Sequence, residues 1–393
     1  MQSLKSNALE PTRSDLAALG RGQAIVRMLP VYGLPILTLL LIAFFSILLP
    51  ASFPTAINAR SILSDKAIIA LLSLAAMVPM MAGRIDLTVG FGIVMWHILA
   101  ISLQVKYGVP WPVACLIVMA CAGAAGLING MLVEVAQIDS FIATLGTGTI
   151  LYALALWHTE GRQVIGVLPQ GFVNINAVSI LGVPIPAVYA LLLAVLMWVV
   201  TERMPLGRHL YAIGANEKAA ALNGIPVRTY VIGVFVVSGL LVGFTGCVLA
   251  SKLQIGQANV GLDYLLPALV GTFLGSTTIR PGRVNVWGTI VGVTILAVGI
   301  SGIQQLGGAF FVEPLFNGIT LLVSIALAGF AQRRRSGAAR KPPIVRIETT
   351  VDQETRRGGP SAPDTRRGGR SAPDTRRGGP SGPPPVEEES HAT

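Results

Sequence analysis

Long apolar runs repeat along this chain and constrain its fold more than any other feature. Ten such runs lie between residues 31 and 330, most of them close to twenty residues long. A helix of about twenty apolar residues crosses a hydrocarbon core of about 30 Å, and in lipid a helix satisfies its own backbone within one segment. We therefore predict an all-α, polytopic membrane helix bundle of about ten spans. The predicted spans are 31–50, 63–82, 88–105, 111–133, 140–158, 183–200, 229–251, 262–276, 284–303 and 312–330.

Two of these runs are short or are interrupted by Gly and Pro. They are the third, 88–105, and the eighth, 262–276. For each of them a continuous helix and a broken or re-entrant helix both stay open. The first run follows a polar, cationic segment and is too long for the apolar region of a cleavable signal peptide, so we expect it to remain as a span.

The charge of the chain fits a membrane protein. Hydrophobic residues make up 52% of the sequence and charged residues only 12%, whereas soluble domains carry about 25% charge. The net charge of +10 does not indicate nucleic-acid binding, because the cations lie between apolar runs and in the tail. With the N-terminus in the cytoplasm, sixteen flanking Lys and Arg residues lie inside and five outside. This asymmetry predicts that both termini are cytoplasmic.

The composition divides the chain into three parts. Residues 1–30 are predicted to form a cytoplasmic segment, 31–330 the transmembrane domain, and 331–393 a disordered tail rich in Arg, Gly and Pro. A ten-residue repeat begins at Thr355 and again at Thr365. Contact of its Arg pairs with anionic membrane lipid and a purely solvated tail both remain open.

The predicted cytoplasmic loop 201–228 contains signals for a short capped helix. Asn216 is a good N-cap, and Glu217 suits the positive end of a helix dipole. The alanines 219–221 favour helix, and Gly224 is placed to end it. A helix of two turns needs support, which could come from the inner face of the bundle or from a groove in a partner.

The same loop resembles the coupling loop of the ribose-type ATP-binding-cassette import permeases. The resemblance runs through Gly207, Arg208, Tyr211, Ala212, Ile213, Gly214, Asn216, Ala219, Ala220, Gly224 and Ile225. Segments 83–90, 127–133, 141–147 and 274–283 resemble further motifs of that family in the same order. The resemblance covers roughly residues 30–330.

The resemblance implies a permease subunit in the cell inner membrane that imports a monosaccharide or similar polyol. It implies three kinds of partner: cytoplasmic ATPase subunits, a second permease copy or paralogue, and an extracytoplasmic solute-binding protein. It also implies that the helix around Glu217 docks on the ATPase. This chain has no phosphate-binding loop of the Walker type, so we expect ATP to be used by the partner subunit and this chain not to be an enzyme. No metal-ligand spacing is present in the sequence either.

The chain departs from the family pattern at Arg84 and Ser276, which each stand where the family has glycine, and at Arg280 and Pro281, which interrupt the second glycine loop. Asp86 is costly to bury at a span boundary and is a functional candidate for that reason, while it could equally cap the third span. His97 and Asn129 are polar groups inside spans, which could face the solute or join helices, and the Thr144 hydroxyl could bond back to carbonyls of its own helix. The predicted pathway or gating residues are therefore Arg84, Asp86, His97, Asn129, Thr144 and Ser276.

An ion-coupled secondary transporter is the alternative function. Broken third and eighth spans would suit such a transporter. The scarcity of charged residues within the spans speaks against it, as does the capped cytoplasmic loop.

Overall fold

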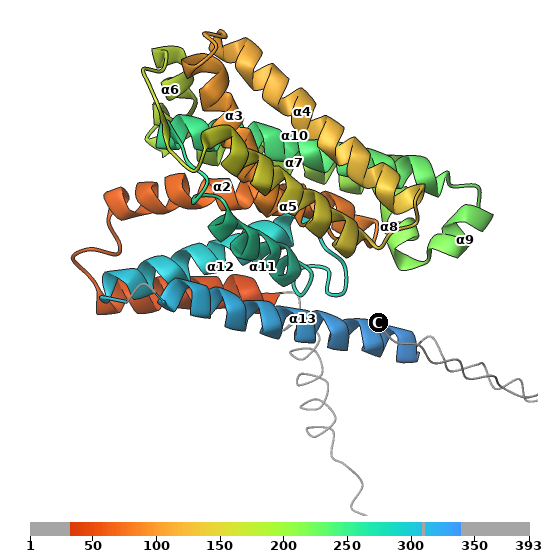
Figure 1. The fold of residues 1–393 in the computed structure, drawn as a ribbon. Helices are drawn as coiled ribbons and strands as arrows, with labels where there is room; N and C mark the ends of the chain where they lie inside the picture. The colour runs from red at the N-terminus through yellow and green to blue at the C-terminus, as the bar shows by residue number, and fades with distance from the viewer. Residues whose placement is uncertain (1–31, 309–310, 339–393) are drawn as a thin grey trace, which may run out of the picture. The chain divides into compact units, whose positions relative to one another are not determined.

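The computed structural model describes residues 32–308 and 311–338, with side chains as far as residue 326. An apolar helix, Tyr32–Leu48, comes first (Figure 1). The helices that follow are α2 (Ala56–Met81), α3 (Thr88–Val105), α4 (Trp111–Glu134), α5 (Ser140–Thr159), α6 (Gln170–Ala177), α7 (Ile185–Arg203), α8 (Pro205–Ala215), α9 (Glu217–Leu222), α10 (Val227–Leu253), α11 (Leu265–Gly275), α12 (Val286–Gln305) and α13 (Val312–Ala338).

The described helices confirm an all-α polytopic membrane protein. Seven of them, α2, α3, α4, α5, α7, α10 and α12, are long and apolar enough to cross a membrane. The third predicted span is one unbroken helix with the predicted bounds. The eighth is short, because its 11-residue helix α11 rises only about 16 Å after a 3-10 turn at Leu262–Tyr264.

The ends of the chain lie largely outside the described residues. The predicted cytoplasmic segment 1–30 is one such part, and so is the repeat tail beyond residue 338. Within the described part, α13 continues to Ala338, eight residues past the predicted end of the last span. The predicted boundary between membrane domain and tail at 330 stays a prediction.

Helix α10 packs closely against α3 and α4, and glycines make this contact possible. A Cβ atom added at Gly126 would lie 2.2 Å from the carbonyl oxygen of Phe235, and one at Gly239 would lie 2.3 Å from that of Ala122. Backbones approach this closely only where a side chain is missing, as is common between helices in membranes. These contacts fix the relative position of α4 and α10.

A second close approach joins the end of α2 to the end of α8. Helix α2 stops at Met81, and Gly83 adopts a positive φ of 76° before α3 begins at Thr88. A Cβ added at Gly214 would lie 2.4 Å from the carbonyl oxygen of Met81. The segment between α2 and α3 is therefore held against the loop that contains α8 and α9.

The connection between α5 and α7 at the opposite end of the spans contains structure that the sequence analysis did not predict. Helix α6 lies there, and Ser251 of α10 donates a hydrogen bond to the carbonyl oxygen of Phe172 at 2.7 Å. Four two-residue strands form two small antiparallel pairs, β1 (Val164–Ile165) with β4 (Ile255–Gly256), and β2 (Ser179–Ile180) with β3 (Val183–Pro184). These elements tie the ends of the spans together.

Candidate functional site

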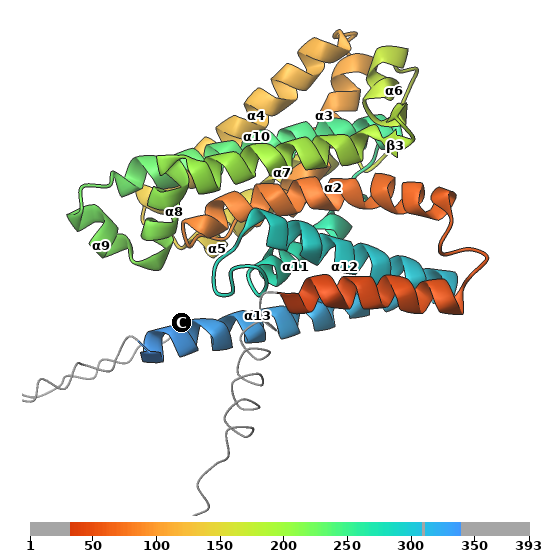
Figure 2. The same ribbon diagram turned by 180° about the vertical axis from the view of Figure 1, so that it is seen from behind.

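The predicted capped helix in the loop 201–228 is present as α9. The Asn216 side chain accepts a hydrogen bond from the backbone N–H of Ala219 at 3.0 Å, which is the predicted N-cap. Glu217 lies in the first turn, and Gly224 has a φ of 80° just after the helix. In Figures 1 and 2, α9 lies beyond α8, beside the end of α4 and the start of α10.

The two faces of α9 have different surroundings. Ala220 is only 4% exposed and packs with Ile213 and Val227 of the same chain. Leu222, at the end of the helix, is 89% exposed. The bundle therefore supports one face of α9, while the opposite face and an apolar side chain remain uncovered within the described part of the chain.

Helix α8, which precedes α9, was missed by the sequence analysis. Its signal was available, because Pro205 suits the first helical position and Leu206, Leu210 and Ile213 recur at helical spacing. Gly207 is necessary for its position, since a Cβ there would lie 2.1 Å from the carbonyl oxygen of Thr201.

Tyr211 anchors α8 to the loop between α11 and α12. Its hydroxyl donates a hydrogen bond to the carbonyl oxygen of Val284 at 2.9 Å, and the guanidinium of Arg283 lies 5.1 Å from the centre of its ring. Burial, assisted by the charge of Glu202, raises the pKa of Tyr211 to about 12. The hydroxyl therefore remains protonated at physiological pH and keeps this hydrogen bond.

The Arg84 side chain reaches towards the loop 201–228 and the end of α4 rather than towards Asp86. Its Nη2 atom donates to Glu134 Oε1 at 2.9 Å and to Glu217 Oε2 at 2.9 Å. Glu134 is the last residue of α4, and Glu217 is the first of α9. Arg84 thus joins the segment after α2 to two other helices.

Asp86 is 1% exposed and is surrounded by hydroxyl and amide donors. Its Oδ1 accepts from the backbone N–H and the hydroxyl of Thr88, and its Oδ2 accepts from Ser238 of α10 at 2.8 Å. The bond to the Thr88 N–H spans two residues and forms an Asx turn, while Leu87 holds the N-cap position of α3 and its side chain makes no cap bond. No cation pairs with it among the described side chains.

Asn129 and Thr144 lie close to Asp86 and extend its hydrogen-bond network. Asn129 donates to Thr88 at 3.3 Å and accepts from Thr147 at 2.6 Å. Thr144 accepts from the backbone N–H of Leu87 at 3.0 Å. The network joins α3, α4, α5 and α10, so these side chains connect helices around the segment that carries Asp86.

The other two predicted pathway residues lie apart from this network. His97 is buried further along α3, where Nδ1 meets the carbonyl oxygen of Ile93 at 2.9 Å and Nε2 accepts from the N–H of Gln257 at 3.3 Å. Ser276 follows α11 and donates to the carbonyl oxygen of Phe273 at 2.7 Å. Both side chains therefore bond to backbone groups, and one partner of His97 comes from a distant segment of the chain.

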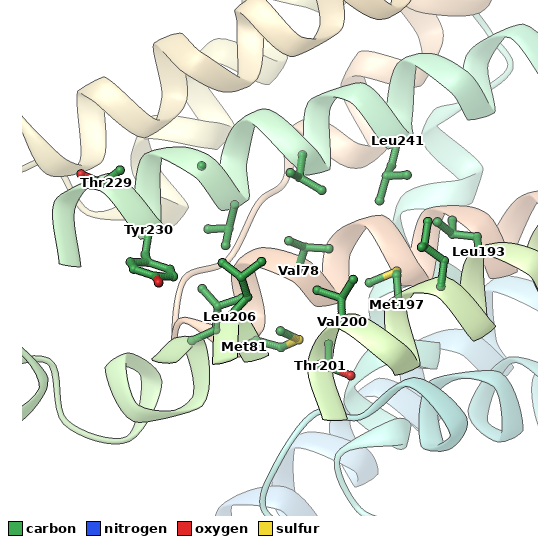
Figure 3. A pocket seen from close by; sticks show the side chains of 15 residues that line it. Val78, Met81, Leu193, Met197, Val200, Thr201, Leu206, Thr229, Tyr230 and Leu241 are labelled. Atoms are coloured by element: carbon green, nitrogen blue, oxygen red, sulfur yellow. The ribbon is translucent and has the colours of Figure 1, made fainter. Parts of the chain in front are cut away.

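A cavity of about 560 Å³ opens between α2, α7, α8 and α10. Figure 3 shows that its wall is mostly aliphatic, with Val78, Leu193, Met197 and Leu241 around it and Tyr230 towards one end. A polyhydroxylated solute needs several hydrogen-bonding partners, so this cavity is not suited to a sugar.

Comparison of the sequence with known proteins identifies a transport family. Residues 58–328 match the family described as "Branched-chain amino acid transport system / permease component". The ribose import permease protein RbsC of Bacillus subtilis is 34% identical over 75% of this chain and 91% of its own length. The D-allose transport system permease protein AlsC of Escherichia coli is 28% identical over 75% of this chain and 90% of its own. The autoinducer 2 import system permease protein LsrD of Escherichia coli is 26% identical over 67% and 81%.

The chain is therefore a transport subunit rather than an enzyme, and it belongs to the family of permease components of ATP-binding-cassette importers. Together with its apolar helices, this places it in the inner membrane as a multi-pass protein. No solved structure matches the chain. The printed relatives are named for ribose, D-allose and autoinducer 2, whereas the family is named for branched-chain amino acids.

Proposed function

We propose that this permease imports a monosaccharide or a similar polyol, and that α9 is the helix on which its ATPase subunits dock. Permeases named for ribose and D-allose align with most of the chain, which supports a sugar-like solute. The observation that carries the docking role is the exposed Leu222 at the end of α9. A protruding apolar side chain on a short helix suits a groove in a partner.

The remaining parts of the assembly follow from the same proposal. Ten spans, with both termini in the cytoplasm, place α8 and α9 on the side that carries more Lys and Arg. A second permease copy or paralogue completes the pathway, and a solute-binding protein delivers the solute on the other side. There the fully exposed Val167 and Leu181 provide apolar contacts for it.

The proposed coupling residues divide by role. Leu222, at the exposed end of α9, contacts the ATPase, together with Arg208, which is exposed on α8. The others hold the loop in shape, because their close contacts or hydrogen bonds lie within this chain. These are Gly207, Tyr211, Gly214, Asn216, Ala220 and Gly224, while Glu217 and Ala219 lie in the first turns of α9.

Co-purification from membranes tests the docking role. The wild-type chain is expected to bring down its ATPase subunit, and Leu222→Asp is expected to lose it while the permease stays folded. Leu181→Asp is the matched control, since it places the same charge on an equally exposed leucine between α5 and α7. Retention of the ATPase by Leu222→Asp would overturn the docking role, and a wild-type chain that brings down no ATPase would overturn the importer assignment.

Uptake measurements test the solute and the energy source. Vesicles that contain the complete importer are expected to take up labelled ribose or D-allose only with ATP, and to continue when ionophores collapse ion gradients. Uptake that needs an ion gradient and not ATP would establish the ion-coupled alternative instead.

A further inference from the structure

We infer that Arg84 is a positioning residue that transmits movement of α9 to the buried segment around Asp86. This inference rests on the proposed docking role of α9. It goes beyond that role because it names the path by which the docking helix reaches the interior of the permease. The path is an ion triad of Arg84, Glu134 and Glu217.

The two halves of the triad differ in burial. The Glu134 side chain is only 6% exposed, and the Glu217 side chain is 48% exposed. Glu134 also stands at the negative end of the α4 dipole, where a carboxylate is unfavourable without a cation. A buried charge depends strongly on its partner, so the bond to Glu134 fixes Arg84 to α4. Of the two ion pairs of Arg84, the pair with Glu217 is the one that solvent or a movement of α9 can break.

The guanidinium of Arg84 does not use all of its hydrogen-bond donors in this arrangement. One nitrogen, Nη2, serves both carboxylates, while the buried Nε has no hydrogen-bond partner among the described residues. Arginine binds a single carboxylate best through two parallel bonds. Withdrawal of α9 therefore frees Arg84 to form a two-bond pair with Glu134, and the chain has two discrete arrangements at this point.

The backbone carries the effect from Arg84 to the interior. Arg84 follows Gly83, whose added Cβ would lie 3.4 Å from Gly214 in the loop before α9. On the other side of Arg84, Ile85 donates its N–H to Ser140 of α5, and Asp86 binds Ser238 of α10. A shift of Arg84 therefore pulls on a segment that α5 and α10 hold two residues away.

A structural role alone would not require the residue to be arginine. Glu134→Gln combined with Arg84→Gly removes the cation together with the buried carboxylate that depends on it. The double variant Arg84→Gly, Glu134→Gln is therefore expected to fold while the ion triad that connects α9 to α4 is absent.

The test uses the complete importer in proteoliposomes with its solute-binding protein, where solute import and ATP hydrolysis are measured together. Glu217→Gln is expected to lower the solute imported per ATP about three-fold, the change expected from losing a half-exposed ion pair. The solute concentration for half-maximal import is expected to stay unchanged, and the ATPase is expected to stay bound. In the Arg84→Gly, Glu134→Gln background, adding Glu217→Gln is expected to cause no further loss, because coupled residues are not additive.

Arg228→Gln is the matched control, since Arg228 is an exposed arginine at the start of α10 with no ion pair among the described residues. It is expected to leave import per ATP unchanged. Unchanged import per ATP in Glu217→Gln, or fully additive losses in the combined variant, would overturn the inference. Loss of the ATPase from Glu217→Gln alone would also overturn it, by making Glu217 a docking contact, whereas the importer assignment stands as long as the wild type retains its ATPase.

Discussion

Helix α10 has two faces that are both apolar and yet are packed in different ways. Towards α4, its backbone comes so close that a Cβ at Gly126 would lie 2.2 Å from the Phe235 oxygen. Towards α7, Gly233 has no atom within 4 Å of the place where its Cβ would be, and the cavity of about 560 Å³ opens there. Figure 3 shows the open side, with Leu241 of α10 facing Leu193 of α7 across it.

Helix α10 is therefore held by its contacts with α2, α3 and α4 rather than by contacts with α7. The contacts with α3 and α4 are dense and include the Ser238 bond to Asp86. The open side has few atoms in contact, and empty space there forfeits dispersion energy. Relative movement of α7 and α10 therefore costs less than relative movement of α4 and α10, and a transport cycle that reshapes this permease is expected to use the open side.

We expect the largest difference in stability between two variants that replace a glycine by leucine, one at Gly126 and one at Gly233. Gly126→Leu cannot be accommodated next to a backbone oxygen and is expected to cost more than about 4 kcal/mol, which abolishes the folded protein. Gly233→Leu points into the cavity and is expected to keep the melting temperature in detergent or to raise it. Equal loss of folded protein in both variants would contradict the one-sided packing of α10.

The next largest difference in the free energy of unfolding is expected when a hydroxyl is removed from each of the two faces of α10. Ser238→Ala takes one donor from the buried carboxylate of Asp86 and is expected to lower the free energy of unfolding by about 2 to 3 kcal/mol, as for hydrogen bonds to charged groups. Thr229→Ala, at an exposed cavity position, is expected to change it by less than about 0.5 kcal/mol. Thermal melting of the purified chain measures both, and a smaller effect for Ser238→Ala would show that Asp86 is not held from α10.

The smallest difference in stability is expected between alanine variants of two valines on α10. Val231 is fully buried, whereas Val237 is 44% exposed beside the cavity. Val231→Ala is expected to cost about 1 to 2 kcal/mol through lost contacts, and Val237→Ala less than half of that. Melting curves recorded in the same detergent compare the two, and equal costs would mean that the open side of α10 is as tightly packed as the other.

Local signals in the sequence were enough for the long apolar helices and for the cap of α9, although α6 and α8 were missed. The bounds of α3 agree with the prediction because its apolar run ends sharply on both sides, and the Asn216 cap forms because its partner is only three residues away. Local reasoning also allowed for Asp86 as a cap of α3, but the N-cap position is Leu87, and Asp86 bonds to the first residue of the helix, Thr88.

Partners that lie far apart in the chain could not be predicted. Arg84 was a candidate for the pathway with Asp86 nearby, and its actual partners lie 50 and 133 residues away. The N–H of Gln257, which binds His97, lies 160 residues away. Such contacts depend on which faces of the helices meet, and one sequence of nearly uniform hydropathy does not carry that information. The roles of these residues in transport remain predictions.

The bond between Asp86 and Ser238 also sets a condition on how the protein is made. The two residues are 152 positions apart in the chain. At a synthesis rate of roughly 5 to 20 residues per second, Asp86 emerges about 8 to 30 seconds before Ser238 exists. During this interval its carboxyl group lacks one of its final partners, and an unpaired polar group in hydrocarbon is costly whether or not it is charged. The segment between α2 and α3 must therefore stay in contact with water, at the surface or inside the insertion machinery, until α10 arrives to seal it.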